Sequence, residues 1–222
     1  MDINYFYKNI GYLKNQNLHL EKHISKQIDT VLNLKDCKLS DAIEISVALN
    51  VPLQLLSEVD IEKKQLAASS AIKMLVLDVD GVMTDGKIIY TEQGDELKQF
   101  YSKDGLAIRA INKKGIKVGF LSHGITGNIL KKRADILYAD YVYVGNEEKP
   151  KVLNEWLKKE GINLKNVAYI GDDLNDLEVI KSVGFSACPA DAVNQIKNNV
   201  HVILNAKGGE GAVRELIDNY LL

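Results

Sequence analysis

The feature that most constrains the fold is a series of short apolar runs, each separated from the next by an amphipathic stretch. The apolar runs lie at residues 72–77, 118–121, 141–144, 167–170 and 201–204. The amphipathic stretches lie at residues 106–114, 125–137, 151–159, 174–183 and 190–198. Strands separated by helices of this length predict βαβ units and a parallel sheet. Because ligands on such sheets bind beyond the carboxyl ends of the strands, we expect the functional site there.

Glycine is distributed unevenly along the chain. Gly11 is the one glycine in the first 70 residues, and all the others lie from Gly81 onward. Glycine permits tight turns and close backbone approaches, so its distribution separates a helical part from a loop-rich part. We therefore predict a small all-helical domain over residues 1–68 and an α/β domain over residues 71–222.

Residues 86–100 interrupt the alternation of strands and helices. Two short halves flank Gln93-Gly94-Asp95, which is a turn signal, so the segment predicts a β-hairpin. It follows directly on an acidic cluster, and we expect it to project over the strand ends as a flap.

Charge and composition exclude several classes of protein. The chain has 28 basic and 30 acidic residues, and the resulting net charge of −2 does not favour binding to a nucleic-acid backbone. No apolar run approaches the ~20 residues that a membrane-spanning helix needs, and no signal peptide is expected at the start. Cys37 and Cys188 cannot form a disulfide framework. We expect a cytoplasmic protein with reduced thiols.

Two carboxylates follow the first apolar run, at Asp78 and Asp80. Carboxylates at the end of a buried strand are unfavourable unless a cation or a ligand balances them. One of them could attack a phosphorus atom and the other could transfer a proton. An acidic strand-end loop without catalytic function would contain the same residues, so this cluster alone leaves both interpretations open.

A second acidic cluster, Asp172, Asp173 and Asp176, follows the run at 167–170. Oxygen ligands at the same sheet edge favour Mg²⁺ over zinc, although Asp before a helix also serves as an N-cap. Ser122 and Lys149 follow two further strands, each at the start of a helix. Both could hold a phosphate group, and both are also ordinary as a cap or a solvated charge.

These motifs in this order resemble the haloacid dehalogenase (HAD) superfamily of phosphatases. DVDGVMTD, LS, K and GDDLND each follow a strand, and the resemblance covers about residues 72–222. It implies a Rossmann-like parallel sheet with helices on both faces. It also implies that Asp78 is the nucleophile of an aspartyl-phosphate mechanism and that Asp80 is the general acid and base. In the same resemblance, Ser122 and Lys149 hold the transferring phosphoryl group.

The resemblance further implies a bound Mg²⁺ ion. Its ligands would be Asp78, Asp80 and Asp172, with Asp173 and Asp176 supporting the metal or its waters. The resemblance thus implies a magnesium-dependent phosphoric monoester hydrolase.

The spacing of the motifs leaves no room for a cap domain, so the chain resembles the capless branch of the superfamily. That branch is typified by the phosphatases of 3-deoxy-D-manno-octulosonate 8-phosphate, in lipopolysaccharide biosynthesis. Residues 102–108 and 207–215 resemble its RDG-containing loop and its GGxGAVRE signature. Flaps pair in a homotetramer in that family, which implies a homotetramer here. The resemblance gives substrate or subunit contacts to Asp104, Gly105, Arg133, Gly208, Gly209 and Arg214.

One departure from that family lies at the second of the four motifs, LS, which we call motif two. The family usually reads Thr-Gly-Arg, whereas this chain reads Ser122-His123-Gly124. The missing arginine keeps a second substrate open, a nine-carbon keto-deoxy sugar acid 9-phosphate. His123 either contacts the substrate or faces solvent.

The first 70 residues lie outside the phosphatase pattern. Residues 38–56 resemble the closing helices of repressor-type helix-turn-helix domains, so a regulatory DNA-binding protein with an inactive HAD fold is a more distant alternative. This segment contains no arginine and slightly more acidic than basic residues, whereas groove-reading domains are ordinarily basic. We therefore favour a helical packing or oligomerisation module.

Overall fold

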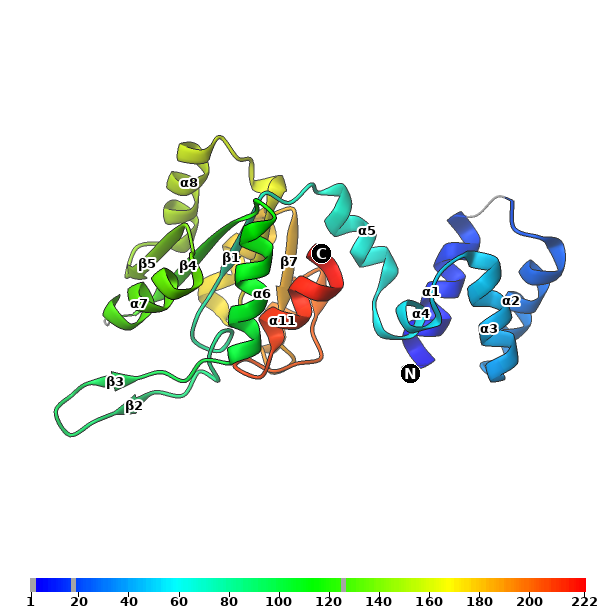
Figure 1. Cartoon of the computed structure of the whole chain (residues 1–222), viewed down its shortest axis with the longest axis horizontal. Coiled ribbons are helices and arrows are strands. Elements are labelled where there is room, and N and C mark those ends of the chain that lie inside the picture. The colour runs from blue at the N-terminus through cyan, green and yellow to red at the C-terminus, as the bar shows by residue number, and fades with distance from the viewer. Residues whose placement is uncertain (1–2, 17–18, 125–126) are drawn as a thin grey trace. The chain divides into compact units, whose positions relative to one another are not determined.

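The chain divides into two compact units, Met1–Gln65 and Leu66–Leu222, in a computed structural model (Figure 1). The structure describes residues 3–16, 19–124 and 127–222. The first unit is helical, and the second combines a parallel sheet with helices.

The first unit is built from helices around a small apolar core. Its helices are α1 (Ile3–Gln16), α2 (Lys22–Leu34), α3 (Leu39–Leu49), α4 (Leu53–Glu58) and the first part of α5 (Ile61–Ser69). The buried Asn9 side chain donates hydrogen bonds to the carbonyl oxygens of Leu56 (2.9 Å) and Val59 (2.7 Å) and accepts one from the Ile61 amide (3.0 Å). One side chain therefore satisfies the backbone groups left unpaired between α4 and α5.

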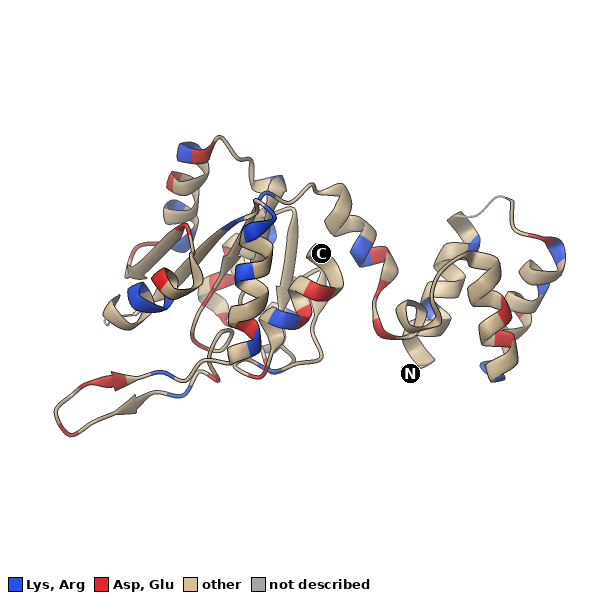
Figure 2. Ribbon diagram, viewed as in Figure 1, with Lys and Arg blue, Asp and Glu red and all other residues tan. Residues whose placement is uncertain are grey.

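The surface of α3 and α4 bears on the helix-turn-helix resemblance. Neither helix contains a lysine or an arginine. Leu39, Ile43 and Val47 are exposed along α3, with Glu44 beside them. Figure 2 shows basic and acidic residues interspersed over this unit rather than gathered into a basic face. Such a surface does not favour docking in a DNA groove.

The second unit contains a six-stranded parallel sheet in the order β5-β4-β1-β6-β7-β8. The chain runs outward from β1 through β4 and β5 and then returns to β6 on the other side of β1. A ligand crevice is expected where the strand order reverses in this way, beyond the carboxyl end of β1. The strands are β1 (Met74–Leu77), β4 (Lys117–His123), β5 (Tyr141–Gly145), β6 (Val167–Ile170), β7 (Phe185–Cys188) and β8 (Val202–Ile203).

Helices cover both faces of this sheet, which confirms the predicted fold class (Figure 1). One face carries α6 (Ser102–Lys113), α7 (Gly127–Leu137) and α11 (Ala212–Leu216). The other carries α8 (Lys149–Glu160) and α9 (Leu177–Ser182). None of the helices in the described parts of the chain is both long and apolar enough to span a bilayer.

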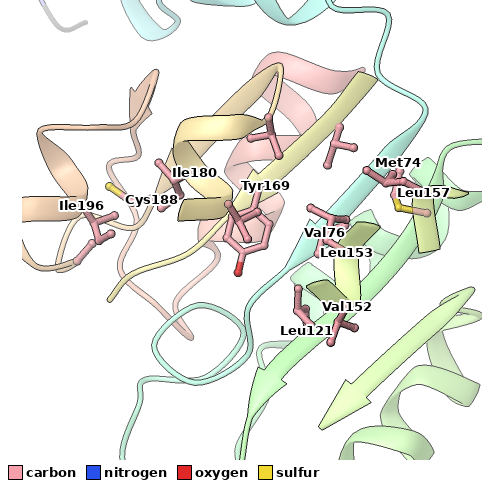
Figure 3. Close-up of a cluster of buried hydrophobic side chains, with 14 residues drawn as sticks. Met74, Val76, Leu121, Val152, Leu153, Leu157, Tyr169, Ile180, Cys188 and Ile196 are labelled. Carbon is pink, nitrogen blue, oxygen red and sulfur yellow. The ribbon is translucent and has the colours of Figure 1, made fainter. Parts of the chain in front are cut away.

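The core between the sheet and α8–α9 explains why the strands read as nearly continuous apolar runs. All four residues of β1 are buried, as expected for a strand covered on both faces. Figure 3 shows Val76 and Tyr169 of neighbouring strands packed with Leu153 of α8 and Ile180 of α9. A rigid apolar base thus lies beneath the strand ends that carry the polar residues.

The predicted β-hairpin is present. Strands β2 (Ile89–Tyr90) and β3 (Glu96–Leu97) pair antiparallel and extend from the α/β unit (Figure 1). The turn contains Gly94 at a φ of +87°, a conformation that glycine adopts without strain. The side chains of β2 and of Leu97 are more than half exposed.

The structure corrects several element boundaries. Strand β7 was not predicted from the sequence. The helix expected at 190–198 is the short α10 (Asn194–Lys197), because Pro189 to Ala192 form a turn. The stretch at 174–183 divides into a 3-10 turn, Leu174–Asp176, and α9. Of the helix expected at 125–137, residues 125–126 lie outside the described residues.

Candidate active site

Adjacent strands bring the two acidic clusters together. Asp78 follows β1 and Asp172 follows β6, and these strands are neighbours in the sheet. The Asp78 amide donates to the Ile170 carbonyl oxygen at 3.0 Å, so the pairing continues past the end of β1. The parallel sheet therefore fixes both carboxylates at one edge.

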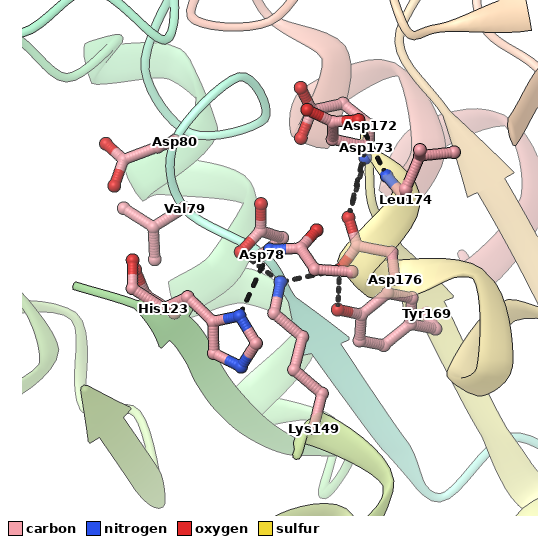
Figure 4. A network of polar contacts seen from close by, with 12 residues as sticks. Asp78, Val79, Asp80, His123, Lys149, Tyr169, Asp172, Asp173, Leu174 and Asp176 are labelled. Carbon is pink, nitrogen blue, oxygen red and sulfur yellow. Dashed lines mark hydrogen bonds and ion pairs between the residues drawn. The ribbon is translucent and has the colours of Figure 1, made fainter. Parts of the chain in front are cut away.

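Three carboxylates meet at this edge, those of Asp78, Asp172 and Asp176 (Figure 4). One oxygen from each lies within 4.8 Å of the others. Asp176 is fully buried, and its Oδ2 accepts hydrogen bonds from the amides of Asp172 (3.0 Å) and Asp173 (3.3 Å). Its Oδ1 accepts a hydrogen bond from the Tyr169 hydroxyl. Asp176 is therefore both the capping-box partner of Asp173, which is the N-cap of this turn, and a member of the carboxylate cluster.

Lys149 places an ammonium group inside this cluster. It is the first residue of α8 and only 1% exposed. Its Nζ donates to Asp78 Oδ1 at 2.7 Å and to Asp176 Oδ1 at 2.6 Å. Burial acts to lower the pKa of Lys149, but the two carboxylates outweigh it and raise that pKa. Lys149 is therefore charged, and it ties the strand-end loop of β1 to that of β6.

The electrostatics of the cluster fit a hard divalent cation. Burial, and after it the charge of Asp176, raises the pKa of Asp78 well above its ordinary range, and Lys149 opposes this. The same two causes raise the pKa of Asp172 to about 7. Asp172 Oδ1 is buried and has no hydrogen-bond partner among the described residues. Three carboxylates facing one ammonium leave excess negative charge on oxygen donors, which is the environment that Mg²⁺ prefers.

Glycines allow the loops of the site to approach one another. Gly81 has a φ of +87°, and a Cβ atom there would lie 2.1 Å from Asp172 Oδ2. A Cβ atom on Gly208 would lie 2.0 Å from the Gly81 carbonyl oxygen, and the Gly209 amide donates to the Val82 carbonyl oxygen at 3.0 Å. The Gly208-Gly209 segment thus packs against the loop that follows Asp78.

Asp80 lies outside the carboxylate cluster. Figure 4 shows its side chain directed away from Asp78 and Lys149. Its Oδ1 accepts a hydrogen bond from Lys98 Nζ at 2.6 Å, a contact that sequence reasoning did not identify. A cavity of about 170 Å³ lies beside this pair. Its lining residues are Asp80, Ile88, Tyr90, Glu96, Lys98, Ser122, His123, Gly124, Leu130 and Val144.

Motif two lies at the end of β4, next to the cavity. Ser122 is buried, and its hydroxyl donates to the His123 carbonyl oxygen at 3.2 Å. His123 Nε2 lies 2.9 Å from the carbonyl oxygen of Glu147, and its Nδ1 lies 3.4 Å from the Asn175 amide nitrogen. Because a carbonyl only accepts, Nε2 carries the proton. His123 therefore links three strand-end loops and lines the cavity as well.

The remaining predicted residues meet around the start of α6, which carries Asp104 and Gly105. Asp104 Oδ1 accepts a hydrogen bond from the Arg214 amide at 2.8 Å, and burial raises the pKa of Asp104 to about 6. A Cβ atom on Gly105 would lie 2.9 Å from the Arg133 guanidinium, which stacks over Phe100 with 4.9 Å to the ring centre. These residues fasten α6 to α7 and α11. Their contact with substrate or with another subunit stays a prediction.

Comparisons with known proteins agree with this site. The profile of the haloacid dehalogenase-like hydrolase family matches residues 131–216. A 3-deoxy-D-manno-octulosonate 8-phosphate phosphatase, KdsC, of Yersinia pestis is 40% identical over 151 residues, which are 68% of this chain and 80% of that protein. KdsC of Escherichia coli K12 is 37% identical over 157 residues, 71% of this chain and 83% of that protein.

A solved structure gives the same result. The 3-deoxy-D-manno-octulosonate 8-phosphate phosphatase from Moraxella catarrhalis, in complex with magnesium, phosphate and KDO, superposes with a TM-score of 0.68 at 36% identity. The match covers 72% of this chain and 90% of that one. The predicted family is therefore confirmed: the chain belongs to the KdsC family of haloacid dehalogenase-like phosphatases.

Proposed function

We propose that the chain is a Mg²⁺-dependent phosphatase that hydrolyses 3-deoxy-D-manno-octulosonate 8-phosphate. The observation that carries this proposal is the cluster of Asp78, Asp172 and Asp176 around the buried Lys149 ammonium, at the sheet edge where ligands bind. The names of its KdsC relatives supply the substrate.

The reaction would proceed in two steps through Asp78. In the first step an Asp78 oxygen forms a bond to phosphorus while the bond to the sugar oxygen breaks, and Asp80 donates a proton to that oxygen. In the second step Asp80 takes a proton from water, and the water oxygen attacks phosphorus and releases phosphate. Asp78 returns to its free carboxylate and Asp80 to its acid form, so the cycle balances.

The other site residues would hold the phosphoryl group and the metal. Lys149 and Ser122 would bind phosphoryl oxygens, where positive charge and hydroxyl donors stabilise the developing negative charge. Asp78 and Asp172 would hold Mg²⁺, with Asp173 and Asp176 in support. Asp80 was also predicted as a ligand, but its side chain is directed away from this cluster, so it keeps the proton-transfer role alone. The ion would supply the positive charge that lets a carboxylate approach a phosphate anion.

The alternative substrate is a nine-carbon keto-deoxy sugar acid 9-phosphate. Gly124 stands where octulosonate phosphatases usually have an arginine, so the cavity offers no arginine among its lining residues. A homotetramer, a cytoplasmic location and a packing role for the helical domain over residues 1–68 stay predictions.

The test is phosphate release from a panel of sugar phosphates that includes both keto acids. We expect Mg²⁺-dependent turnover with the highest kcat/KM for the eight-carbon substrate, and loss of turnover on addition of EDTA. Asp78→Asn should abolish turnover while the circular dichroism spectrum stays unchanged. Asp135→Asn, a change at an exposed position of α7, is the matched control. Retained turnover in Asp78→Asn would refute the nucleophile assignment, and a higher kcat/KM for the nine-carbon acid would refute the substrate.

A further inference from the structure

Lys98 is a buried lysine on the flap. It directly follows β3, and its side chain is only 6% exposed. Its Nζ lies 2.6 Å from Asp80 Oδ1 and 2.6 Å from Glu96 Oε1. Its immediate neighbours Leu97 and Gln99 are exposed, and Glu96 is half-buried. Lys98 is therefore the point at which an otherwise solvent-facing hairpin is fastened to the loop after β1.

The contact is selective for one oxygen of Asp80. Oδ1 accepts the Lys98 bond, and the Thr84 hydroxyl lies 3.3 Å from the same atom. Within the described parts of the chain, Oδ2 has no such donor. A charge-assisted bond to a largely desolvated ammonium is shorter and stronger than a neutral one, so it restrains the direction of the carboxylate. The Lys98 bond therefore distinguishes the two oxygens of a carboxylate that lines the cavity together with Lys98.

We propose that Lys98 is a positioning residue for the phosphatase reaction: from the flap it fixes the Asp80 carboxylate in the orientation that transfers a proton to the leaving oxygen. This inference rests on the proposed role of Asp80 as general acid. Lys98 acts through Asp80, and Glu96 holds Lys98 from the other side. The hairpin would thus contribute to the chemistry through a side chain at its base.

The dependence on the leaving group distinguishes positioning from a merely structural role. An alkyl phosphate releases a strongly basic alkoxide, which needs the proton from Asp80. p-Nitrophenyl phosphate releases a phenolate that is stable without protonation. The value of kcat/KM covers the steps up to departure of the leaving group. A misdirected Asp80 therefore lowers kcat/KM for the alkyl ester and leaves it nearly unchanged for the aryl ester.

The first measurement compares Lys98→Met with the wild type on both esters. We expect kcat/KM for the sugar phosphate to fall by about tenfold or more, since a small misplacement of a catalytic group has effects of this size. The value for p-nitrophenyl phosphate should stay close to that of the wild type. Lys98→Arg, which keeps charge and donors, should recover most of the loss. Lys87→Met is the control, because Lys87 is a flap lysine that is exposed and pairs with Asp85.

The second measurement is a double-mutant cycle with Asp80→Asn. If Lys98 acts through Asp80, Lys98→Met lowers kcat/KM no further once Asp80 has been replaced. Equal losses on the two esters, or additive effects in the cycle, would overturn the proposal. Lys98→Gln, which keeps a polar chain, must show the same ester dependence if Lys98→Met does not fold. Failure of the proposed function is a separate result, since it appears as turnover in Asp78→Asn.

Discussion

Replacement of Lys149 by methionine removes the one ammonium that contacts two buried carboxylates, at 2.7 Å from Asp78 and 2.6 Å from Asp176. Methionine keeps a long unbranched side chain, so little packing is lost. Removing one partner of a buried ion pair leaves the other charge uncompensated and lowers the free energy of unfolding by about 3–5 kcal/mol. We expect Lys149→Met to be destabilised by that amount at pH 8 without Mg²⁺.

The destabilisation should depend on pH, because protonation relieves it. Burial and the charge of Asp176 already raise the pKa of Asp78 and Asp172, and loss of the Lys149 ammonium raises these pKa values further. A carboxyl group whose pKa is higher in the folded protein than in the unfolded chain stabilises the fold at pH values below its unfolded pKa of 3.8. This stabilisation is lost as pH rises through the pKa of the folded state. The difference from the wild type should therefore grow between pH 5 and pH 8.

Trp156 makes the measurement specific to the α/β unit. It is the single tryptophan of the chain and lies on α8, the helix that begins at Lys149. Urea unfolding followed by its fluorescence, at pH 5 and pH 8, gives the free energies of unfolding. Lys151→Met, a change on the same helix that removes an exposed pair with Glu147 of the preceding loop, should change stability by less than about 0.5 kcal/mol. A wild-type midpoint for Lys149→Met at pH 8, or a difference that shrinks as pH rises, would refute the reasoning.

Two further substitutions test the loop after β1 and the first turn of α6. Gly81→Ala should lower activity about a hundredfold and weaken Mg²⁺ binding in titration calorimetry, because its Cβ would displace Asp172. The control is Gly115→Ala, at a similar φ with no neighbour within 4 Å, which should cause only about 1 kcal/mol of backbone strain. Equal losses of Mg²⁺ binding in the two variants would contradict this. Asp104→Asn should be about 1–3 kcal/mol more stable than the wild type at pH 7, because burial raises the pKa of Asp104 to about 6 and the charged form disfavours folding above that pH. Thermal unfolding should show the two proteins converging near pH 4, and a constant difference would argue against it.

The sequence was sufficient for the features that follow from sheet geometry. Apolar runs separated by amphipathic stretches predict parallel strands, and parallel strands bring Asp78 and Asp172 to one edge. Strand β7 was missed because Phe-Ser-Ala-Cys contains no β-branched residue and shows no alternation. The Lys98–Asp80 contact depends on how the hairpin folds back over the loop, which spacing along the chain does not determine. Asp176 was given as either a cap or a metal support. Its buried carboxylate instead completes the capping box that Asp173 begins, and it also contacts Lys149.

The close approach of Gly208 to Gly81 makes the loop after Asp78 depend on the C-terminal part of the chain. The loop after Asp78 is braced by a segment that lies far along the chain, and closing the long intervening stretch costs conformational entropy. A polypeptide that stops before Gly208 retains every strand of the sheet but lacks this brace. The C-terminal segment thus supplies two things at once, the brace for the loop after Asp78 and the buried residues of α11 that cover one face of the sheet.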